Sequence, residues 1–189
     1  DPLIWEQHPD PERYQRDAFE NRVFRGGMES GGAFAIIDNS DGRIVGTTRF
    51  YEWDPAAREV AIGYTFLVRS HWGGPVNREM KQLLLDHAFR WAKTVWLHIG
   101  ENNKRSRRAT EKLGARLSHI EIKGAGAFAR PTAFYRIEAE AWQRQACDHA
   151  TSRSTRHWHR PRRRAGTAAR HAAATVCARA ASLTPPCSR

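Results

Sequence analysis

Cysteine is missing from most of this chain. The three cysteines, Cys147, Cys177 and Cys187, all lie toward the C-terminal end of the 189 residues. This distribution excludes a disulfide framework, a cysteine-ligated zinc site and a thiol nucleophile from residues 1–146. No apolar run approaches the ~18 residues of a membrane-spanning helix, and no basic segment followed by an apolar stretch indicates a signal peptide. We therefore expect a soluble protein of a reducing compartment, the cytoplasm.

Acidic residues are scarce only toward the C-terminal end. The whole chain carries a net charge of +11, but the residues from Gln145 onward contain nine Arg, a single acid and no Lys. Residues 1–144 hold 22 basic and 19 acidic side chains, so their net charge is only +3. Because the charge of this longer part is nearly balanced, it does not by itself indicate a nucleic-acid partner.

Large apolar residues are also scarce at the C-terminal end. Residues 144–189 are dominated by Ala and Arg and cannot bury enough surface to offset the entropy lost on ordering. Their composition is also typical of out-of-frame reading of GC-rich DNA, so they need not be native coding sequence. We expect one domain over residues 1–143 and a disordered tail over residues 144–189.

The spacing of apolar residues predicts a succession of helices and strands before the tail. Helical spacing begins at Pro11, and glycine pairs at 26–27 and 31–32 are expected to end that helix. A second helix is expected to present one apolar face, made of Met80, Leu83, Leu84, His87, Ala88 and Trp91. The predicted elements are a helix over 11–25, strands over 33–37, 43–53 and 59–68, a helix over 77–93, a strand over 94–99, a helix over 106–113 that Gly114 stops, and strands over 116–122 and 133–137. This order predicts a mixed α/β (α+β) domain with a central sheet.

Two turns that lead into predicted helices have features of anion sites. Residues 69–77 (RSHWGGPVN) join a strand to a helix, and such a glycine turn directs backbone N–H groups and a helix N-terminus at one point. Residues 103–108 (NKRSRR) place four cations in a first helical turn, where they oppose the helix dipole unless an anion is bound. Without an anion, the two segments would be a plain glycine loop and a solvated basic face.

Together these segments resemble a known family. The strand VAIGYTFL at residues 60–67, the glycine turn and the helix start NREM are similar to the acetyl-CoA signature of the GCN5-related N-acetyltransferases (GNAT). The segment from Asn103 through Ser106 to EKLGA at residues 111–115 is also similar to that signature. The resemblance covers about residues 1–140. Within the family, the chain is most similar to the branch that includes the N-terminal alanine acetyltransferases of ribosomal proteins. It implies an acyl-CoA N-acyltransferase fold and transfer of an acetyl group to a primary amine, either a protein N-terminus or a small molecule.

The resemblance also implies how acetyl-CoA would bind. In this family two neighbouring strands separate, and the pantetheine arm lies between them like an added strand. The residues implied to bind the donor are Thr65, Phe66 and Leu67 through their backbone, Gly73, Gly74, Val76 and Asn77 at the pyrophosphate, Asn103 at the pantetheine arm, and Lys104, Arg105, Arg107 and Arg108 at the other phosphates. The implied partners are acetyl-CoA and an amine, with no metal and no membrane.

The catalytic groups are implied less directly. The family often uses a Tyr as the acid for the leaving thiolate where this chain has Thr110, so Ser106, which a related branch uses, becomes the candidate acid. The catalytic Glu of the family corresponds to Ala61, and Glu59, two residues earlier on the same strand face, becomes the candidate base. Equally, Ser106 could make only a local backbone bond and Glu59 could be a surface carboxylate. Further candidates are His71 and His119 for the base, and Glu52, Glu59 and Glu101 for receiving a cationic amine.

Departures from the family pattern keep other hypotheses open. Pro75 stands where the turn usually has Gly, and it has no N–H for a phosphate. The family usually has a strand and most of a helix before the segment that resembles residues 1–5, so we expect an N-terminally truncated domain whose exposed sheet edge favours a homodimer. The alternatives are a non-catalytic acyl-CoA-binding module and non-specific nucleic-acid binding through the arginines of the tail. A zinc site made of Cys147, His149, His157 and His159 has no standard ligand spacing to support it.

Overall fold

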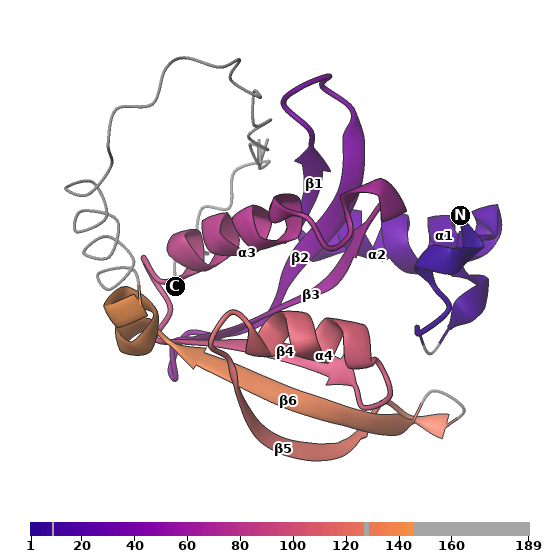
Figure 1. The fold of residues 1–189 in the computed structure, drawn as a ribbon. Helices are drawn as coiled ribbons and strands as arrows, with labels where there is room; N and C mark the ends of the chain where they lie inside the picture. Colours follow the sequence, from indigo (N-terminus) through magenta and orange to yellow (C-terminus); the bar gives the residue numbers. More distant parts are fainter. Residues whose placement is uncertain (9, 127–128, 146–189) are drawn as a thin grey trace, which may run out of the picture.

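The computed structural model describes residues 1–8, 10–126 and 129–145, and its elements follow the predicted order (Figure 1). The helical elements are η1 (Pro2–Ile4), η2 (Pro11–Tyr14), α1 (Arg16–Phe19), η3 (Glu20–Arg25), α2 (Gly26–Ser30), η4 (Arg69–His71), α3 (Pro75–Ala88) and α4 (Lys104–Glu111), and residues 139–145 are also helical. The strands are β1 (Ala33–Ile37), β2 (Ile44–Asp54), β3 (Glu59–Leu67), β4 (Thr94–Gly100), β5 (Arg116–Lys123) and β6 (Arg130–Glu138). The predicted mixed α/β fold is therefore confirmed.

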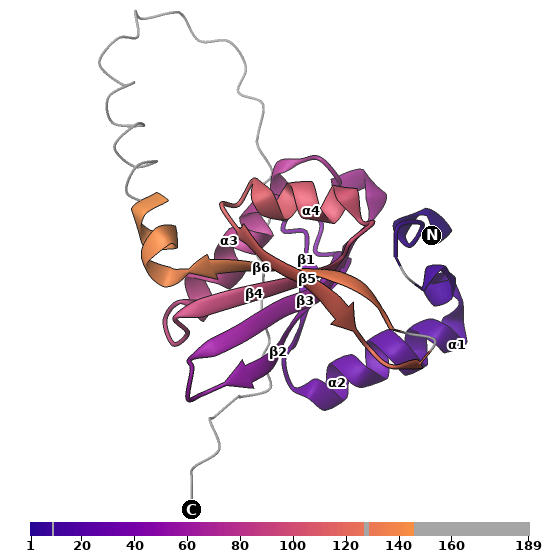
Figure 2. The same cartoon turned by 90° about the horizontal axis from the view of Figure 1, so that it is seen from below.

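The six strands form a single sheet in the order β1-β2-β3-β4-β6-β5. β3 and β4 are parallel, with α3 as the crossover between them, and the other neighbouring strands are antiparallel. Figure 2 shows α3 and α4 on one side of the sheet and the segment from α1 to α2 on the other. One face of the sheet is therefore covered by α3 and α4, whereas β5, at the edge, is exposed over almost its whole length.

The core lies between α3 and the covered face of the sheet. Its strand residues alternate along β3, β4 and β6: they are Val60, Ile62, Val95, Leu97, Tyr135 and Ile137, none more than 3% exposed. Because side chains alternate across a strand, the residues between them point to the opposite face. That second face carries Ala61, Trp96 and His98, which line a pocket described below.

The first helical segment continues past its predicted end. Gly26 and Gly27 lie inside α2, and the helix ends at Gly31, whose φ of 65° is left-handed. A Cβ on Gly27 would lie 3.4 Å from the Cβ of Ala33 and 3.7 Å from a guanidinium nitrogen of Arg49. The prediction that the first glycine pair ends the helix is therefore wrong, because that pair allows close packing against β1 and β2, and only the second pair stops the helix.

The buried face of α3 differs in part from the predicted apolar face. Leu83 is 41% exposed, whereas Lys81 is only 8% exposed and lies on the buried side. The buried residues of the helix are Met80, Lys81, Leu84, Leu85 and Ala88. The predicted apolar face and the observed buried face both have helical spacing, and they share Met80, Leu84 and Ala88. The periodicity of the sequence therefore did not determine which of the neighbouring positions face the sheet. The helix also ends at Ala88, earlier than predicted.

Within the described ranges, no helix combines the length and the apolar character that crossing a bilayer requires. The same part of the chain contains no group of His, Cys, Asp and Glu that could hold a metal ion. The tail was predicted over residues 144–189; residues 144 and 145 belong to the last described helix, and the predictions of disorder, nucleic-acid binding and a zinc site otherwise concern residues 146–189, which lie outside the described residues.

Candidate functional site

β3 and β4 are paired over only part of their length. Parallel pairing runs from Glu59 and Thr94 to Ala61 and Trp96 and then stops, although both strands continue. Figure 1 shows the two strands diverging beyond this point. The separated part of β3 contains a bulge at Tyr64, whose φ is 51°. The two strands thus form a fork in which the backbone groups of one strand are not paired with the other.

The backbone predicted to bind the donor lies in this fork. Thr65, Phe66 and Leu67 all follow the last β3–β4 pair, and Phe66 and Leu67 still pair with β2 on their other side. The carbonyl oxygen of Leu67 accepts a hydrogen bond of 2.9 Å from the indole Nε1 of Trp72. One edge of β3 is therefore held by β2, and its edge toward β4 resembles the exposed edge to which an extended ligand can add.

The glycine turn carries the chain from β3 into α3. Gly73 has a φ of 68°, which favours glycine, and a Cβ there would meet nothing within 4 Å. Gly74 is the N-cap of α3, and Pro75 occupies the first helical turn, where the helix does not need its missing N–H. The predicted phosphate-binding residues Gly73, Gly74, Val76 and Asn77 all lie at this one helix N-terminus. Its backbone N–H groups and dipole suit a bound anion.

α4 begins with a capping residue that was predicted to bind the donor. Asn103 is the N-cap, and its Oδ1 accepts a hydrogen bond of 3.0 Å from the backbone N–H of Ser106. Ser106 is half-buried. Arg107 turns toward the sheet, where its Nε donates to the Tyr135 hydroxyl at 2.9 Å and its NH1 to the carbonyl of Glu101 at 3.1 Å. Asn103 and Arg107 therefore stabilise α4 and its contact with the sheet, whereas Lys104 and Arg108 are exposed.

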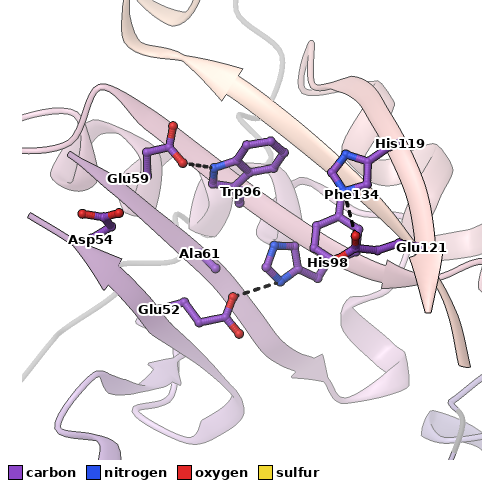
Figure 3. Close-up of a pocket in the computed structure, with 9 residues that line it drawn as sticks. All are labelled: Glu52, Asp54, Glu59, Ala61, Trp96, His98, His119, Glu121 and Phe134. Atoms are coloured by element: carbon purple, nitrogen blue, oxygen red, sulfur yellow. Dashed lines mark hydrogen bonds and ion pairs between the residues drawn. The ribbon is translucent and has the colours of Figure 1, made fainter. Parts of the chain in front are cut away.

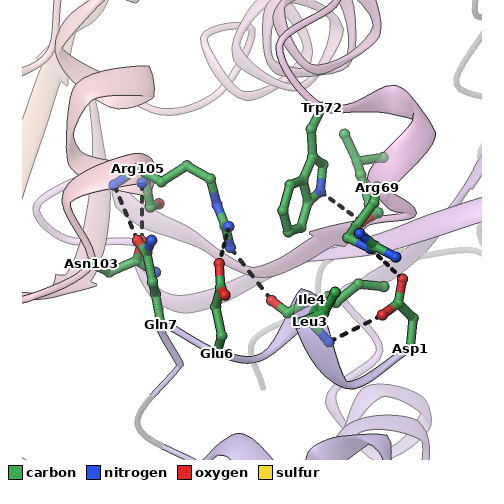
Figure 4. A network of polar contacts seen from close by, with 11 residues as sticks. Asp1, Leu3, Ile4, Glu6, Gln7, Arg69, Trp72, Asn103 and Arg105 are labelled. Carbon is green, nitrogen blue, oxygen red and sulfur yellow. Dashed lines mark hydrogen bonds and ion pairs between the residues drawn. The ribbon is translucent and has the colours of Figure 1, made fainter.

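Arg105 connects α4 with the glycine turn and with the N-terminal segment (Figure 4). Its guanidinium lies 3.8 Å from the centroid of the Trp72 ring, and its NH1 lies 3.4 Å from a carboxylate oxygen of Glu6. Arg69 of η4 makes a similar contact, with 2.5 Å between its Nε and the carboxylate of Asp1. Two carboxylates of the N-terminal segment therefore neutralise two cations close to the N-terminal ends of α3 and α4.

A pocket of about 300 Å³ lies on the face of the sheet opposite α3 (Figure 3). It is lined by Glu52, Asp54, Glu59, Ala61, Trp96, His98, His119, Glu121 and Phe134. Ala61 and Trp96 form the last pair before β3 and β4 separate, so the pocket reaches the base of the fork. Four carboxylates line it, and Lys123 beside it forms an ion pair of 2.6 Å with Glu52. The excess of negative charge favours a cationic ligand.

The carboxylates predicted for the acceptor fall in two places. Glu59 is held at the pocket by Trp96, whose indole Nε1 donates to its carboxylate at 2.7 Å, and it shares a strand face with Ala61 as predicted. Glu52 also lines the pocket. Glu101 does not line it and instead follows the far end of β4, where its backbone N–H bonds to the Pro131 carbonyl at 3.0 Å.

The two histidines predicted as alternative bases also separate. His71 lies 2.9 Å from the carboxylate of Asp38, in the turn after β1, and does not line the pocket. His119 does line it and stacks on the ring of Phe134 with 4.6 Å between ring centroids. Of the two, only His119 therefore lines the pocket.

His98 is a pocket residue that sequence reasoning missed. It lies on β4 just beyond the last β3–β4 pair, and its side chain is only 8% exposed. Its Nδ1 lies 2.8 Å from the Nζ of Lys123 and 3.0 Å from the hydroxyl of Tyr51. Burial, followed by the charge of Lys123, lowers the pKa of His98 to about 4, so the ring is neutral at pH 7. Its position two residues after Trp96 on one strand was the available signal for a shared face.

Comparisons with known proteins agree with this geometry. Residues 1–116 match the family model of the acetyltransferase (GNAT) domain, a range that includes the fork, the glycine turn, α3 and α4. No curated protein sequence matches the chain.

Solved structures share the fold. A GCN5-related N-acetyltransferase from Brucella melitensis is 22% identical with a TM-score of 0.66, and the alignment covers 75% of this chain and 66% of that one, just under two thirds of its length. A candidate acetyltransferase is 28% identical with a TM-score of 0.63 and 76% of both chains covered. Another, from T. thermophilus, is also 28% identical, with a TM-score of 0.58 and 68% and 70% of the two chains covered.

Proposed function

This chain belongs to the GNAT acetyltransferase family, and from that premise we propose that it transfers the acetyl group of acetyl-CoA to a primary amine. The observation that carries the proposal is the fork between β3 and β4, with a helix N-terminus at its open end and an acidic pocket at its base. A donor in the fork and an amine in the pocket would meet where Ala61 and Trp96 form the last strand pair.

The fit of the chain to acetyl-CoA rests on the fork and the glycine turn. The edge of β3 at Thr65, Phe66 and Leu67 is free of β4, which supports pairing with a pantetheine arm. The open surroundings of Gly73 and the N-terminal turn of α3, with Gly74, Val76 and Asn77, support binding of a pyrophosphate, although Pro75 offers no N–H there. When bound, acetyl-CoA supplies an activated thioester.

The cations near the fork are not equally available to the donor. Arg105 is the favoured phosphate ligand, because its partner Glu6 is half exposed and can be displaced. Arg107 already donates through Nε to Tyr135 and through NH1 to Glu101, so its predicted contact with the donor has to use its remaining N–H groups. Asn103 can retain its capping bond through Oδ1 and offer its amide N–H₂ to the pantetheine arm.

The reaction requires orientation and proton transfer more than covalent help. A neutral amine attacks the thioester carbon, the C–N bond forms as the C–S bond breaks, the amine loses a proton and the thiolate gains one. Glu59 is the proposed base, acting directly or through a water, because Trp96 holds its carboxylate at the pocket. Ser106 is the proposed acid for the thiolate, since Thr110 is buried and cannot replace a tyrosine there.

Several finer points are part of this proposal. They are a small-molecule amine or a protein N-terminus as the acceptor, kinship with the ribosomal-protein alanine acetyltransferases, a domain that ends at residue 143, a homodimer and a cytoplasmic location. A peptide that begins with alanine, placed beside small amines in one assay, separates the acceptors.

Release of the CoA thiol tests the proposal. The full chain is mixed with acetyl-CoA and a panel of amines and peptides, and mass spectrometry identifies the acetylated product. We expect release with at least one amine, and a rate at least tenfold lower in Glu59→Gln, since a positioned base contributes about 10²-fold or more. The matched control is Glu29→Gln, an exposed residue of α2.

The same experiment separates the proposed enzyme from a non-catalytic module. Stabilisation by acetyl-CoA on heating without thiol release for any amine would favour an acyl-CoA-binding module. No stabilisation at millimolar acetyl-CoA would contradict both.

A further inference from the structure

The acidic pocket contains a ring nitrogen, the Nε2 of His98, that has no hydrogen-bond partner among the described residues. Figure 3 shows that Nδ1 faces Glu52, while the other ring nitrogen is on the side of Ala61 and Trp96. The side chain is 92% removed from solvent, as its exposure of 8% implies. Among the described residues, Nε of Arg49 is the only side-chain nitrogen or oxygen that is fully enclosed and lacks a partner, so Nε2 of His98 is accessible from the pocket and can bond to a ligand there.

The neighbours of Nδ1 determine which ring nitrogen carries the proton. An ammonium can only donate, so the Nζ of Lys123, 2.8 Å away, requires Nδ1 to accept. Burial raises the pKa of Tyr51 far above its ordinary value, so its hydroxyl, 3.0 Å from the same atom, keeps its proton. A neutral imidazole carries a single N–H, which must therefore be on Nε2. His98 consequently presents a hydrogen-bond donor to the pocket.

The other polar groups of the pocket wall mostly accept. Asp54, Glu59 and Glu121 supply carboxylates, while Lys123 already occupies Glu52. The apolar part of the wall is aromatic, made by Trp96 and by Phe134, whose ring centroid lies 4.3 Å from that of His98. A ligand that satisfies this wall needs ammonium groups for the carboxylates and an oxygen for the N–H of His98.

On the basis of the proposed function, we propose that His98 is a specificity-determining donor for the acceptor, and that the pocket takes amines bearing both a second ammonium group and a hydroxyl or carbonyl oxygen. His98 follows Trp96 on β4, so an oxygen bound to its Nε2 lies beside the base of the fork, close to the amine that reacts. Glu59 lies on the same face and can receive the amine proton, and Asp54 or Glu121, which also line the pocket, can bind the second ammonium. A simple polyamine without oxygen offers no acceptor to the N–H of His98.

The tautomer can be tested without any substrate. Long-range ¹H–¹⁵N correlation spectra of the full chain, with His98 assigned by its absence in His98→Gln, distinguish a proton on Nε2 from one on Nδ1. We expect the Nε2–H pattern at pH 7, and a mixture of tautomers in Lys123→Met. An Nδ1–H pattern in the wild-type protein would overturn the proposal.

Four related amines test the specificity: propylamine, 1-amino-2-propanol, 1,3-diaminopropane and 1,3-diamino-2-propanol. They differ only by one oxygen and one amine, so the contributions of the two groups are measured separately. We expect 1,3-diamino-2-propanol to have the highest kcat/KM once the fraction of neutral amine is taken into account. The advantage of the hydroxyl should be about fivefold to tenfold, the size of a single hydrogen bond to a buried donor.

Substitutions of His98 separate specificity from structure. His98→Ala should lose the hydroxyl advantage chiefly through KM while it still acetylates 1,3-diaminopropane, and His98→Gln, whose amide donates, should restore part of it. His87→Gln, at an exposed position of α3, is the matched control and should keep the advantage. If His98→Ala weakens all four amines by the same factor, or if the wild type shows no hydroxyl advantage, the proposal is wrong. If none of the four amines nor any other amine is acetylated, the proposed function itself fails, and the tautomer measurement still decides the state of His98.

Discussion

Lys81 places an ammonium group inside the interface between α3 and the sheet, where it is only 8% exposed. Its Nζ donates to the Thr65 hydroxyl at 3.2 Å, and that hydroxyl lies 2.8 Å from the one of Thr48. Burial lowers the pKa of Lys81 from 10.5 to about 8. Since the unfolded chain has the ordinary pKa, the charged side chain destabilises the folded protein at neutral pH.

The size of this effect follows from the two pKa values. Their difference corresponds to about 3 kcal/mol, and the hydrogen bond to Thr65 offsets about 1 kcal/mol of it. Lys81→Met keeps the length of the side chain and removes the charge, so we expect the free energy of unfolding to rise by about 2 kcal/mol at pH 7. Between pH 8 and pH 10.5 the unfolded state binds more protons than the folded state. Wild-type stability should therefore rise with pH across this window, and its deficit relative to the variant should shrink.

Urea unfolding at several pH values from 6 to 10.5 measures both quantities. Lys93→Met, at an exposed position, is the control and should show no such convergence with the wild type. If Lys81→Met is less stable than the wild type at pH 7 by an amount that does not change with pH, the ammonium is not destabilised by burial and the reasoning is refuted.

Three further predictions concern the fold and the site. Gly32→Ala should lower the free energy of unfolding by about 2 kcal/mol or more, because a Cβ there would lie 2.2 Å from the Phe50 carbonyl oxygen. Gly27→Ala, where the nearest atom would be 3.4 Å away, should stay within about 1 kcal/mol of the wild type. Thermal unfolding measures both variants, and equal effects would contradict the packing argument. Asn103→Ala should lower the free energy of unfolding by about 1 kcal/mol through the lost cap of α4, and it should also weaken acetyl-CoA binding, which calorimetry measures. Asn103→Ser should restore the stability but not the binding, because serine can cap the helix but has no amide N–H₂. Full recovery of binding in the serine variant would show that Asn103 acts only as the cap. The free energy of unfolding should fall as the pH is lowered from 6.5 to 4, because burial lowers the pKa of both His8 and His98 to about 4 and the unfolded chain therefore protonates these rings first. His98 should account for up to about 3 kcal/mol of this fall, so His98→Gln should reduce the slope in urea titrations and leave the part due to His8. An unchanged slope would mean that His98 is not held neutral.

The features that could be predicted from the sequence are those that local residue patterns determine. Gly114 has a φ of 87° after α4, as expected for a residue that stops a helix, and the strand predicted over 33–37 is β1. The glycine turn before α3 was likewise predicted, because turn preferences depend on neighbours in the chain. The N-cap of α4 was not predicted, since the helix was expected to begin only at Ser106, whereas Asn103 caps a helix that begins at Lys104.

The features that could not be predicted depend on contacts between distant segments. Arg105 meets Glu6 across 99 positions of sequence, so its neutralisation was invisible in a run of cations. The pocket assembles residues of β2, β3, β4, β5 and β6, and the role of His98 depends on Lys123 and Tyr51 from two other strands. The residues next to a single histidine in a strand do not indicate which side chains it will contact, because its partners depend on the order and register of the strands in the folded sheet.

Thiol release from acetyl-CoA in the presence of 1,3-diamino-2-propanol, with the acetylated amine quantified by mass spectrometry, tests the central claim most directly. We predict one acetylated amine for each CoA released, at a rate that saturates in both substrates and falls at least tenfold in Glu59→Gln. Acetyl-CoA that binds the protein but releases no CoA with this amine, with the other three amines or with an alanine-initiated peptide would contradict the account.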